Sequence, residues 1–128
     1  MSRRDAREIT FKLVFEYAFN KRDNKEEFEE YTAGLNEDDK SYVSEVYFGV
    51  VSHYDDLEEK ISGVIEKFAY DRLFKVDLAI LLVAAYEITF MESVPYKVSV
   101  DEALNLAEKY STSKSVKYIN GVLAKFAR

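Results

Sequence analysis

The segment at residues 75–90 is apolar on nearly every side, and it constrains the possible folds more than any other part of the sequence. Its apolar residues neither alternate nor gather on one stripe: Val76, Leu78, Ala79, Ile80, Leu81, Leu82, Val83, Ala84 and Ala85. A helix that is hydrophobic all round must be enclosed by other elements. Its longest uncharged apolar run, residues 78–86, falls far short of the roughly 20 residues of a membrane span. The segment therefore predicts the central helix of a bundle.

The rest of the sequence also carries helical patterns. In the first segment Ala6, Ile9, Leu13 and Tyr17 recur at helical spacing and predict one buried stripe. The chain has only one Pro and four Gly, and it has no hairpin signal between strand-like runs. We expect a single all-α domain, residues 1–128, of about seven helices. Five of them are expected at residues 3–20, 24–33, 54–68, 75–90 and 99–110. The third helix follows a cap at Asn36 and has apolar positions from 42 to 50, and the seventh follows a loop and cap at 111–113 and runs to residue 128.

Capping residues mark several of the expected helix starts. Ser2 and Asn36 each precede an Asp at the N3 position. Pro95 interrupts the chain before the sixth helix, since Pro cannot continue a helix. Ser99 and Glu102 have the spacing of a capping box, so we expect the sixth helix to begin at Ser99.

The sequence offers few groups for catalysis or metal binding. It has no Cys, which excludes disulfides and thiolate metal sites, and His53 is its one histidine. Neither a histidine metal cluster nor a nucleophile–histidine dyad can be assembled from these residues. We therefore expect no enzyme activity, no metal and no cofactor. The N-terminus lacks the apolar stretch of a signal peptide, so we expect a cytoplasmic protein without a membrane segment.

Charge is distributed unevenly along the chain, whose net charge is −6. Residues 1–22 and 97–128 each carry six basic and three acidic residues, whereas residues 23–96 carry six basic and eighteen acidic ones. Basic ends and an acidic centre suggest one anionic and one cationic partner. Charge blocks are also typical of solvated faces, and charge alone leaves both interpretations open.

Basic and aromatic residues are interleaved near both ends of the sequence. Three arginines occupy the first turns of the first expected helix, partly on one face. A second group flanks a polar loop: Lys109, Tyr110, Lys114, Lys117 and Tyr118. Cations suit phosphates and aromatic rings suit bases, a combination typical of single-stranded RNA binding. Helix ends often carry Arg and Lys for other reasons, so these residues alone do not decide the question.

Several blocks, in order and at matching spacing, resemble the NusB family over nearly the whole chain. Residues 94–110, VPYKVSVDEALNLAEKY, resemble the family's VP-x-x-V-x-I-[ND]-EA-x-x-LAK motif. Residues 117–123, KYINGVL, resemble its KF[VI]NG[VI]L motif. Residues 3–8, 71–77 and 86–88 match further blocks.

This resemblance implies an all-α fold of two packed helical bundles and a role in transcription antitermination, especially of ribosomal RNA operons. NusB-type proteins pair with NusE, which is also a small-subunit ribosomal protein. The heterodimer binds the single-stranded boxA element of nascent RNA and joins other Nus factors on RNA polymerase. Some relatives are thought to form a homodimer that hides the RNA surface, and the sequence does not decide the oligomeric state.

The resemblance also implies roles for particular residues. It implies that Asp77 meets a basic side chain of NusE, although compensation of the helix dipole is an alternative reason for this residue. It implies a structural role for Gly121, through close helix packing. The residues implied in RNA contact are Arg3, Arg4, Arg7, Tyr110, Ser111, Lys114, Lys117 and Tyr118.

Three departures from the family pattern concern RNA affinity. Asp5 interrupts the arginine run, Leu82 replaces a commoner Arg, and Ser111 replaces a commoner Gly. We therefore expect weak RNA binding by the chain alone, strengthened by NusE. An alternative is a helical protein–protein adaptor without RNA contact. A NusB-like domain also precedes some ribosomal-RNA cytosine methyltransferases, but these 128 residues include no cofactor domain and no Cys nucleophile.

Overall fold

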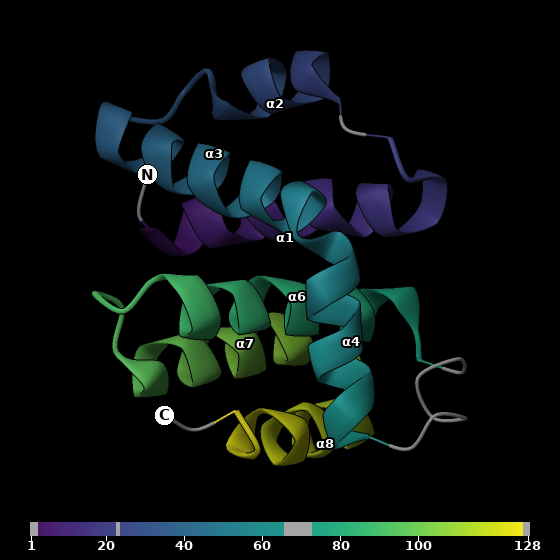
Figure 1. Ribbon diagram of the computed structural model, residues 1–128. Helices are drawn as coiled ribbons and strands as arrows, with labels where there is room; N and C mark the ends of the chain where they lie inside the picture. The colour runs from purple at the N-terminus through teal and green to yellow at the C-terminus, as the bar shows by residue number, and fades with distance from the viewer. Residues whose placement is uncertain (1–2, 23, 66–72, 127–128) are drawn as a thin grey trace.

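The computed structural model describes residues 3–22, 24–65 and 73–126, and it contains seven α-helices within them (Figure 1). No strand occurs in these ranges. The helices are α1 (Arg3–Asn20), α2 (Lys25–Thr32), α3 (Glu37–Ser52), α4 (Tyr54–Val64), α6 (Lys75–Phe90), α7 (Tyr96–Tyr110) and α8 (Ser113–Ala124).

The helices form two packed layers, as Figure 1 shows. One layer contains α1, α2 and α3, and the other contains α6, α7 and α8, with α4 running across from the first layer to the second. The two layers meet mainly where α1 packs against α6. The predicted all-α fold of two packed helical bundles is confirmed.

Helix α6 lies at the centre of the molecule, as its composition predicts. Every residue from 77 to 88 is buried, and α6 packs against α1, α3, α4, α7 and α8. Burying a single large aliphatic side chain contributes roughly 1.5–3 kcal/mol, so the buried residues of this helix contribute a large share of the stability of the core. Helix α1 is buried more widely than its predicted stripe, because α3 covers one side and α6 and α7 cover others.

The predicted start of the sixth helix is wrong. Helix α7 begins at Tyr96, directly after Pro95, and Ser99 lies inside it. Ser99 is 2 % exposed and donates a hydrogen bond to Glu87 at 3.1 Å, so its hydroxyl serves a contact between helices rather than a cap. By contrast, the side chain of Asn36 caps α3 by accepting from the amide of Asp39, as predicted. The predicted fourth helix is too long, because α4 ends at Val64 and Ile65 has an extended backbone. The predicted Ser2 cap and residues 66–68 of the predicted fourth helix lie outside the described residues.

The expected packing role of Gly121 is also wrong. Gly121 is exposed on α8, and a Cβ atom added there would have no neighbour within 4 Å. The closely packed glycine is Gly49 in α3, where an added Cβ would overlap the ring of Tyr86 from α6. The sequence pattern does not distinguish these two helical glycines, because the difference depends on tertiary neighbours.

Candidate nucleic-acid interface

The first turn of α1 carries two exposed arginines, each paired with a carboxylate from another helix. Arg3 donates from Nε to Oδ1 of Asp39 in α3 at 2.8 Å. Arg4 donates to both oxygens of Glu102 in α7, at 3.3 and 3.4 Å. The Arg4 side chain is 65 % exposed, whereas that of Glu102 is 16 % exposed. Both guanidinium groups therefore remain accessible to a phosphate from outside.

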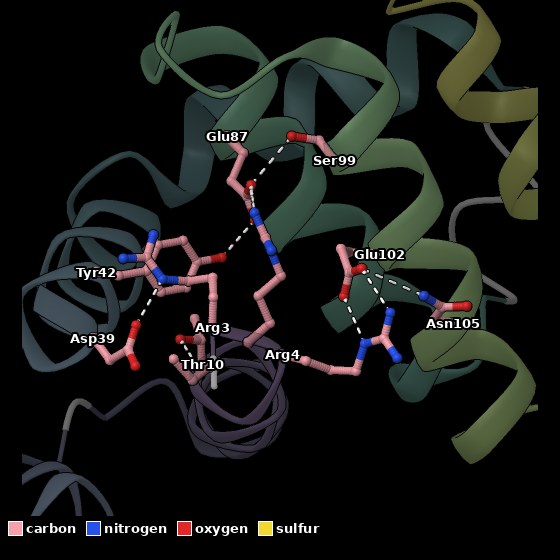
Figure 2. A network of polar contacts seen from close by, with 11 residues as sticks. Arg3, Arg4, Thr10, Asp39, Tyr42, Glu87, Ser99, Glu102 and Asn105 are labelled. Carbon is pink, nitrogen blue, oxygen red and sulfur yellow. Dashed lines mark hydrogen bonds and ion pairs between the residues drawn. The ribbon is translucent and has the colours of Figure 1, made fainter. Parts of the chain in front are cut away.

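Arg7 occupies a different environment, although it lies only one turn further along α1. Its side chain is 7 % exposed, and its guanidinium donates to the two oxygens of Glu87 in α6 at 3.0 and 3.1 Å. Figure 2 shows that this carboxylate also accepts from Tyr42 of α3, at 2.5 Å, and from Ser99 of α7. The structure thus places Arg7 inside a four-helix polar network instead of on the surface expected to contact RNA.

In the network around Glu87, the Arg7 guanidinium stays charged and the Tyr42 hydroxyl stays protonated. Burial lowers the pKa of Arg7, but the hydrogen bonds to Glu87 and the negative charge nearby more than offset this and raise it. Burial and the charge of Glu87 raise the pKa of Tyr42 well above its usual value, so its hydroxyl remains a donor. The guanidinium of Arg3 also lies 4.7 Å from the centre of the Tyr42 ring. Tyr42 therefore links the buried network to an exposed arginine.

The end of α7 is tied to the same side of α1. Lys109 donates to the two oxygens of Glu8 at 2.7 and 3.0 Å, and the Tyr110 hydroxyl donates to Glu8 at 2.5 Å. Hydrogen bonds from Lys109 and Tyr110 lower the pKa of Glu8, which is therefore ionised at neutral pH. The Tyr110 ring also contacts Phe11, with 5.0 Å between ring centres. Since Arg4 pairs with Glu102 and Glu8 with Lys109, α1 and α7 run in the same direction along this edge.

The loop after α7 and the start of α8 continue from this edge. Lys114 and Lys117 are exposed and form no ion pair with any described residue. Tyr118 is half-buried, and its hydroxyl has no hydrogen-bond partner in the described part of the chain. Burial, followed by the charge of Asp77, raises the pKa of Tyr118. These two lysines are the cations on this edge that are most available to an external anion.

Asp77 is buried in the first turn of α6 and holds this loop in place. Its side chain accepts from the hydroxyls of Ser111 and Ser115, both at 2.7 Å, and it is 4 % exposed. The structure therefore gives Asp77 two internal partners, and it does not place the carboxylate on a surface that faces a partner protein. Ser111, which was expected to contact RNA, uses its hydroxyl for this internal bond.

The structure brings Arg4, Lys109 and Tyr110 together where the start of α1 meets the end of α7, and Ser111 and Lys114 follow directly. Arg3 pairs toward α3 instead, and Lys117 and Tyr118 line a pocket with Val64 and Ile65 at the end of α4. We call these eight residues the basic edge. Sequence reasoning missed the carboxylates of Asp39, Glu8 and Glu102 that pair with its cations. No local signal could have revealed these pairs, because the partners are separated by 36 to 101 residues.

No helix in the described ranges has the length and apolar character needed to cross a membrane.

Comparison with known proteins identifies the family of this chain. The model of the NusB family matches residues 4–128. A transcription antitermination protein NusB from Clostridium novyi is 40 % identical, with 96 % of each chain covered. A protein with the same name from Acetivibrio thermocellus is 39 % identical and covers the whole of this chain and 90 % of its own.

Solved structures show the same architecture. A NusB structure from T. maritima aligns with a TM-score of 0.91 and 30 % identity, covering 99 % of this chain and 91 % of the other. A chain from a crystal structure of the antitermination factors NusB and NusE in complex with dsRNA aligns with a TM-score of 0.86 and 24 % identity, covering 97 % and 94 %. At that identity the second likeness concerns the fold alone.

The fold and the basic edge together define a small all-helical protein built to contact other macromolecules. The chain belongs to the NusB family.

Proposed function

We propose that this chain is a transcription antitermination factor that binds boxA-type RNA together with NusE. The observation that carries the proposal is the basic edge, where two ion pairs join α1 to α7 and the cations of these pairs, Arg4 and Lys109, remain exposed. Its membership of the NusB family and the names of its relatives support the proposal. The related NusB that was crystallised with NusE and RNA provides a precedent for the assembly.

In this proposal the residues of the basic edge divide into two groups. Phosphates are contacted by the residues whose charged groups are exposed: Arg3, Arg4, Lys109, Lys114 and Lys117. Tyr110, Ser111 and Tyr118 lie at the same edge and provide stacking and polar contacts to the bases. Arg7 supports this surface from inside, since its partner Glu87 ties α1 to α6 and α7.

The NusE-binding surface is proposed at the end of the molecule where α1 finishes and α6 begins (Figure 1). Two phenylalanines in these segments, Phe19 and Phe74, are each 62 % exposed, and large exposed apolar groups often mark protein contacts. Asp77, three residues after Phe74, supports this surface by holding the loop at Ser111. The acidic central part of the sequence suits a basic ribosomal protein.

The proposal places the chain in the cytoplasm, where the RNA-bound complex joins other Nus factors and RNA polymerase. It assigns no catalytic step to the chain.

The test measures the RNA affinity of the complex with NusE for three variants: Arg4→Ala, the double variant Lys114→Ala/Lys117→Ala, and Lys25→Ala. Lys25 is an exposed lysine of α2, a helix that packs against α1 and α3, and it serves as the control. Each lost phosphate contact should reduce the salt slope of single-strand binding by about 0.7. We expect weaker binding and lower slopes for the first two variants only. Equal affinities for all variants, with NusE binding intact, would favour a protein–protein adaptor.

A further inference from the structure

A groove of about 230 Å³ lies between α1 and α7 in the middle of the basic edge. Arg4 lines one end and Lys109 the other. Between them lie the carboxylates of Glu8 and Glu102, and the amide of Asn105. The groove therefore connects the arginines of α1 with the lysines and tyrosines that follow α7.

The cations and the carboxylates of this groove differ in exposure. The side chains of Arg4 and Lys109 are 65 % and 60 % exposed, whereas those of Glu102 and Glu8 are 16 % and 18 % exposed. The cations thus stand at the rim and the carboxylates lie lower, beside the buried Leu106. A phosphate can reach the rim, but the carboxylates repel it from the interior.

The interior of the groove is rich in hydrogen-bond acceptors. Glu102 accepts from Asn105 at 3.4 Å and from Arg4 at 3.3 and 3.4 Å, and Figure 2 shows these three side chains together. These bonds are long and partly exposed, so they yield readily to a better donor. Ionised carboxylates accept only, which means that a ligand inside the groove must present N–H or O–H donors. The low pKa of Glu8 keeps it in this acceptor state.

In a single-stranded RNA the ribose 2′-hydroxyl and the bases carry such donors. Adenine, cytosine and guanine have an exocyclic amino group with two N–H donors. Uracil has a single imino N–H between two carbonyl oxygens, and these oxygens are repelled by the carboxylates of the groove. The carboxylate of Glu102 can accept from an amino group, and the amide of Asn105 can both donate and accept. Leu106 provides an apolar contact for the ring.

We propose that the groove between α1 and α7 binds one amino-bearing nucleobase of the RNA strand and excludes uracil there, while the flanking phosphates contact Arg4 and Lys109. This proposal rests on the proposed function, since it assigns base recognition to the same RNA surface. It gives the chain a specificity site in addition to its phosphate contacts.

The test uses the complex with NusE and a series of boxA RNAs in which each adenine, cytosine or guanine is replaced by uracil, one at a time. We expect at least one position where the replacement weakens binding about tenfold, as for other direct base contacts. In Glu102→Ala this loss should shrink to less than about threefold at the same position. Glu108→Ala is the matched control, because Glu108 is an exposed glutamate of α7 that does not line the groove.

Asn105→Ala provides an independent variant, because Asn105 is exposed on α7 and its replacement leaves the core intact. This variant should also lose less affinity than the unaltered protein when uracil is placed at that position. If the complex binds boxA RNA but Glu102→Ala and Asn105→Ala discriminate as the unaltered protein does, the groove proposal is overturned and the proposed function stands. If the complex binds no RNA at all, both proposals fail.

Discussion

Arg4 and Arg7 lie one helical turn apart in α1, yet their side chains have opposite environments. Arg4 is exposed and loosely paired, whereas Arg7 is buried and doubly bonded to Glu87. An exposed pair contributes little to stability, but a buried charge without its partner is strongly unfavourable. At the residue scale, replacing Arg4 should therefore affect mainly binding, whereas replacing Arg7 should affect mainly stability.

Glu87→Gln tests the buried network. The substitution preserves size but leaves the Arg7 charge without a carboxylate, so the free energy of unfolding should fall by about 3 to 5 kcal/mol. Urea denaturation of the purified variant measures this change. Glu108→Gln, which removes the same charge at an exposed position of α7, should stay within about 0.5 kcal/mol of the unaltered protein. Equal stabilities for the two variants would show that the Glu87 network does not stabilise the fold.

The raised pKa of Glu16 predicts that the free energy of unfolding depends on pH. Burial, a hydrogen bond with Glu27 and the charge of Glu27 raise the pKa of Glu16 from 4.5 to about 7. Because its pKa is higher in the folded than in the unfolded chain, the folded protein binds more protons across this interval. The contribution of Glu16 to stability is therefore fully present below about pH 4.5 and is lost as the pH rises through about 7.

Glu16→Gln should remove this dependence. Urea denaturation between pH 5 and 8 should show the variant gaining stability relative to the unaltered protein as the pH rises. Glu26→Gln, at an exposed position of α2, is the control and should show no such trend. A constant difference between Glu16→Gln and the unaltered protein at every pH would contradict the raised pKa of Glu16.

At the scale of the helices, local signals predict most of the fold. The apolar segment of α6 predicts both its bounds and its central position, because its pattern leaves no face for solvent. Asn36 caps α3 through the expected side-chain bond, and Thr112 caps α8 in the same way. The predicted start at Ser99 is wrong because Pro95 already allows α7 to begin, and Glu87 then binds the Ser99 hydroxyl.

Replacing Gly121 and Gly49 by Ala should change the free energy of unfolding in opposite directions. Gly121→Ala should raise the free energy of unfolding by about 0.5–1 kcal/mol, because the position is exposed and Ala favours a helix. Gly49→Ala should lower it by about 1–3 kcal/mol, because the new Cβ overlaps the Tyr86 ring. Thermal and urea denaturation of both variants measure the difference. A destabilising Gly121→Ala would mean that this glycine serves a contact of the folded chain.

At the scale of the whole molecule, the sequence predicts which exposed cations belong to the basic edge. It does not predict which residues beneath that edge are buried. Exposed cations such as Arg4, Lys114 and Lys117 could be predicted because their positions follow from helix spacing and polarity. The burial of Arg7 and Asp77 could not, because it depends on Glu87 and Ser111, which are 80 and 34 residues away. The groove between α1 and α7 was equally inaccessible, since it exists only when these helices pack together.

Folding also brings charged segments from the two ends of the sequence together. Both basic ends of the sequence contribute to one edge, through α1 at one end and α7 and α8 at the other. Carboxylates beneath that edge offset part of its charge, so the chain alone should bind RNA weakly. A partner that adds contacts to the same strand should strengthen the binding.

The proposed function is that this chain binds boxA RNA together with NusE. The most direct test is to titrate fluorescent boxA RNA, and a scrambled control RNA, with the chain alone and with its complex with NusE. Each titration is made at two salt concentrations. We predict weak binding by the chain alone, and tighter, boxA-specific binding with NusE that weakens as salt increases. Tight binding by the chain alone with no gain from NusE would contradict the shared surface. No RNA binding despite a stable complex with NusE would contradict the RNA-binding function itself.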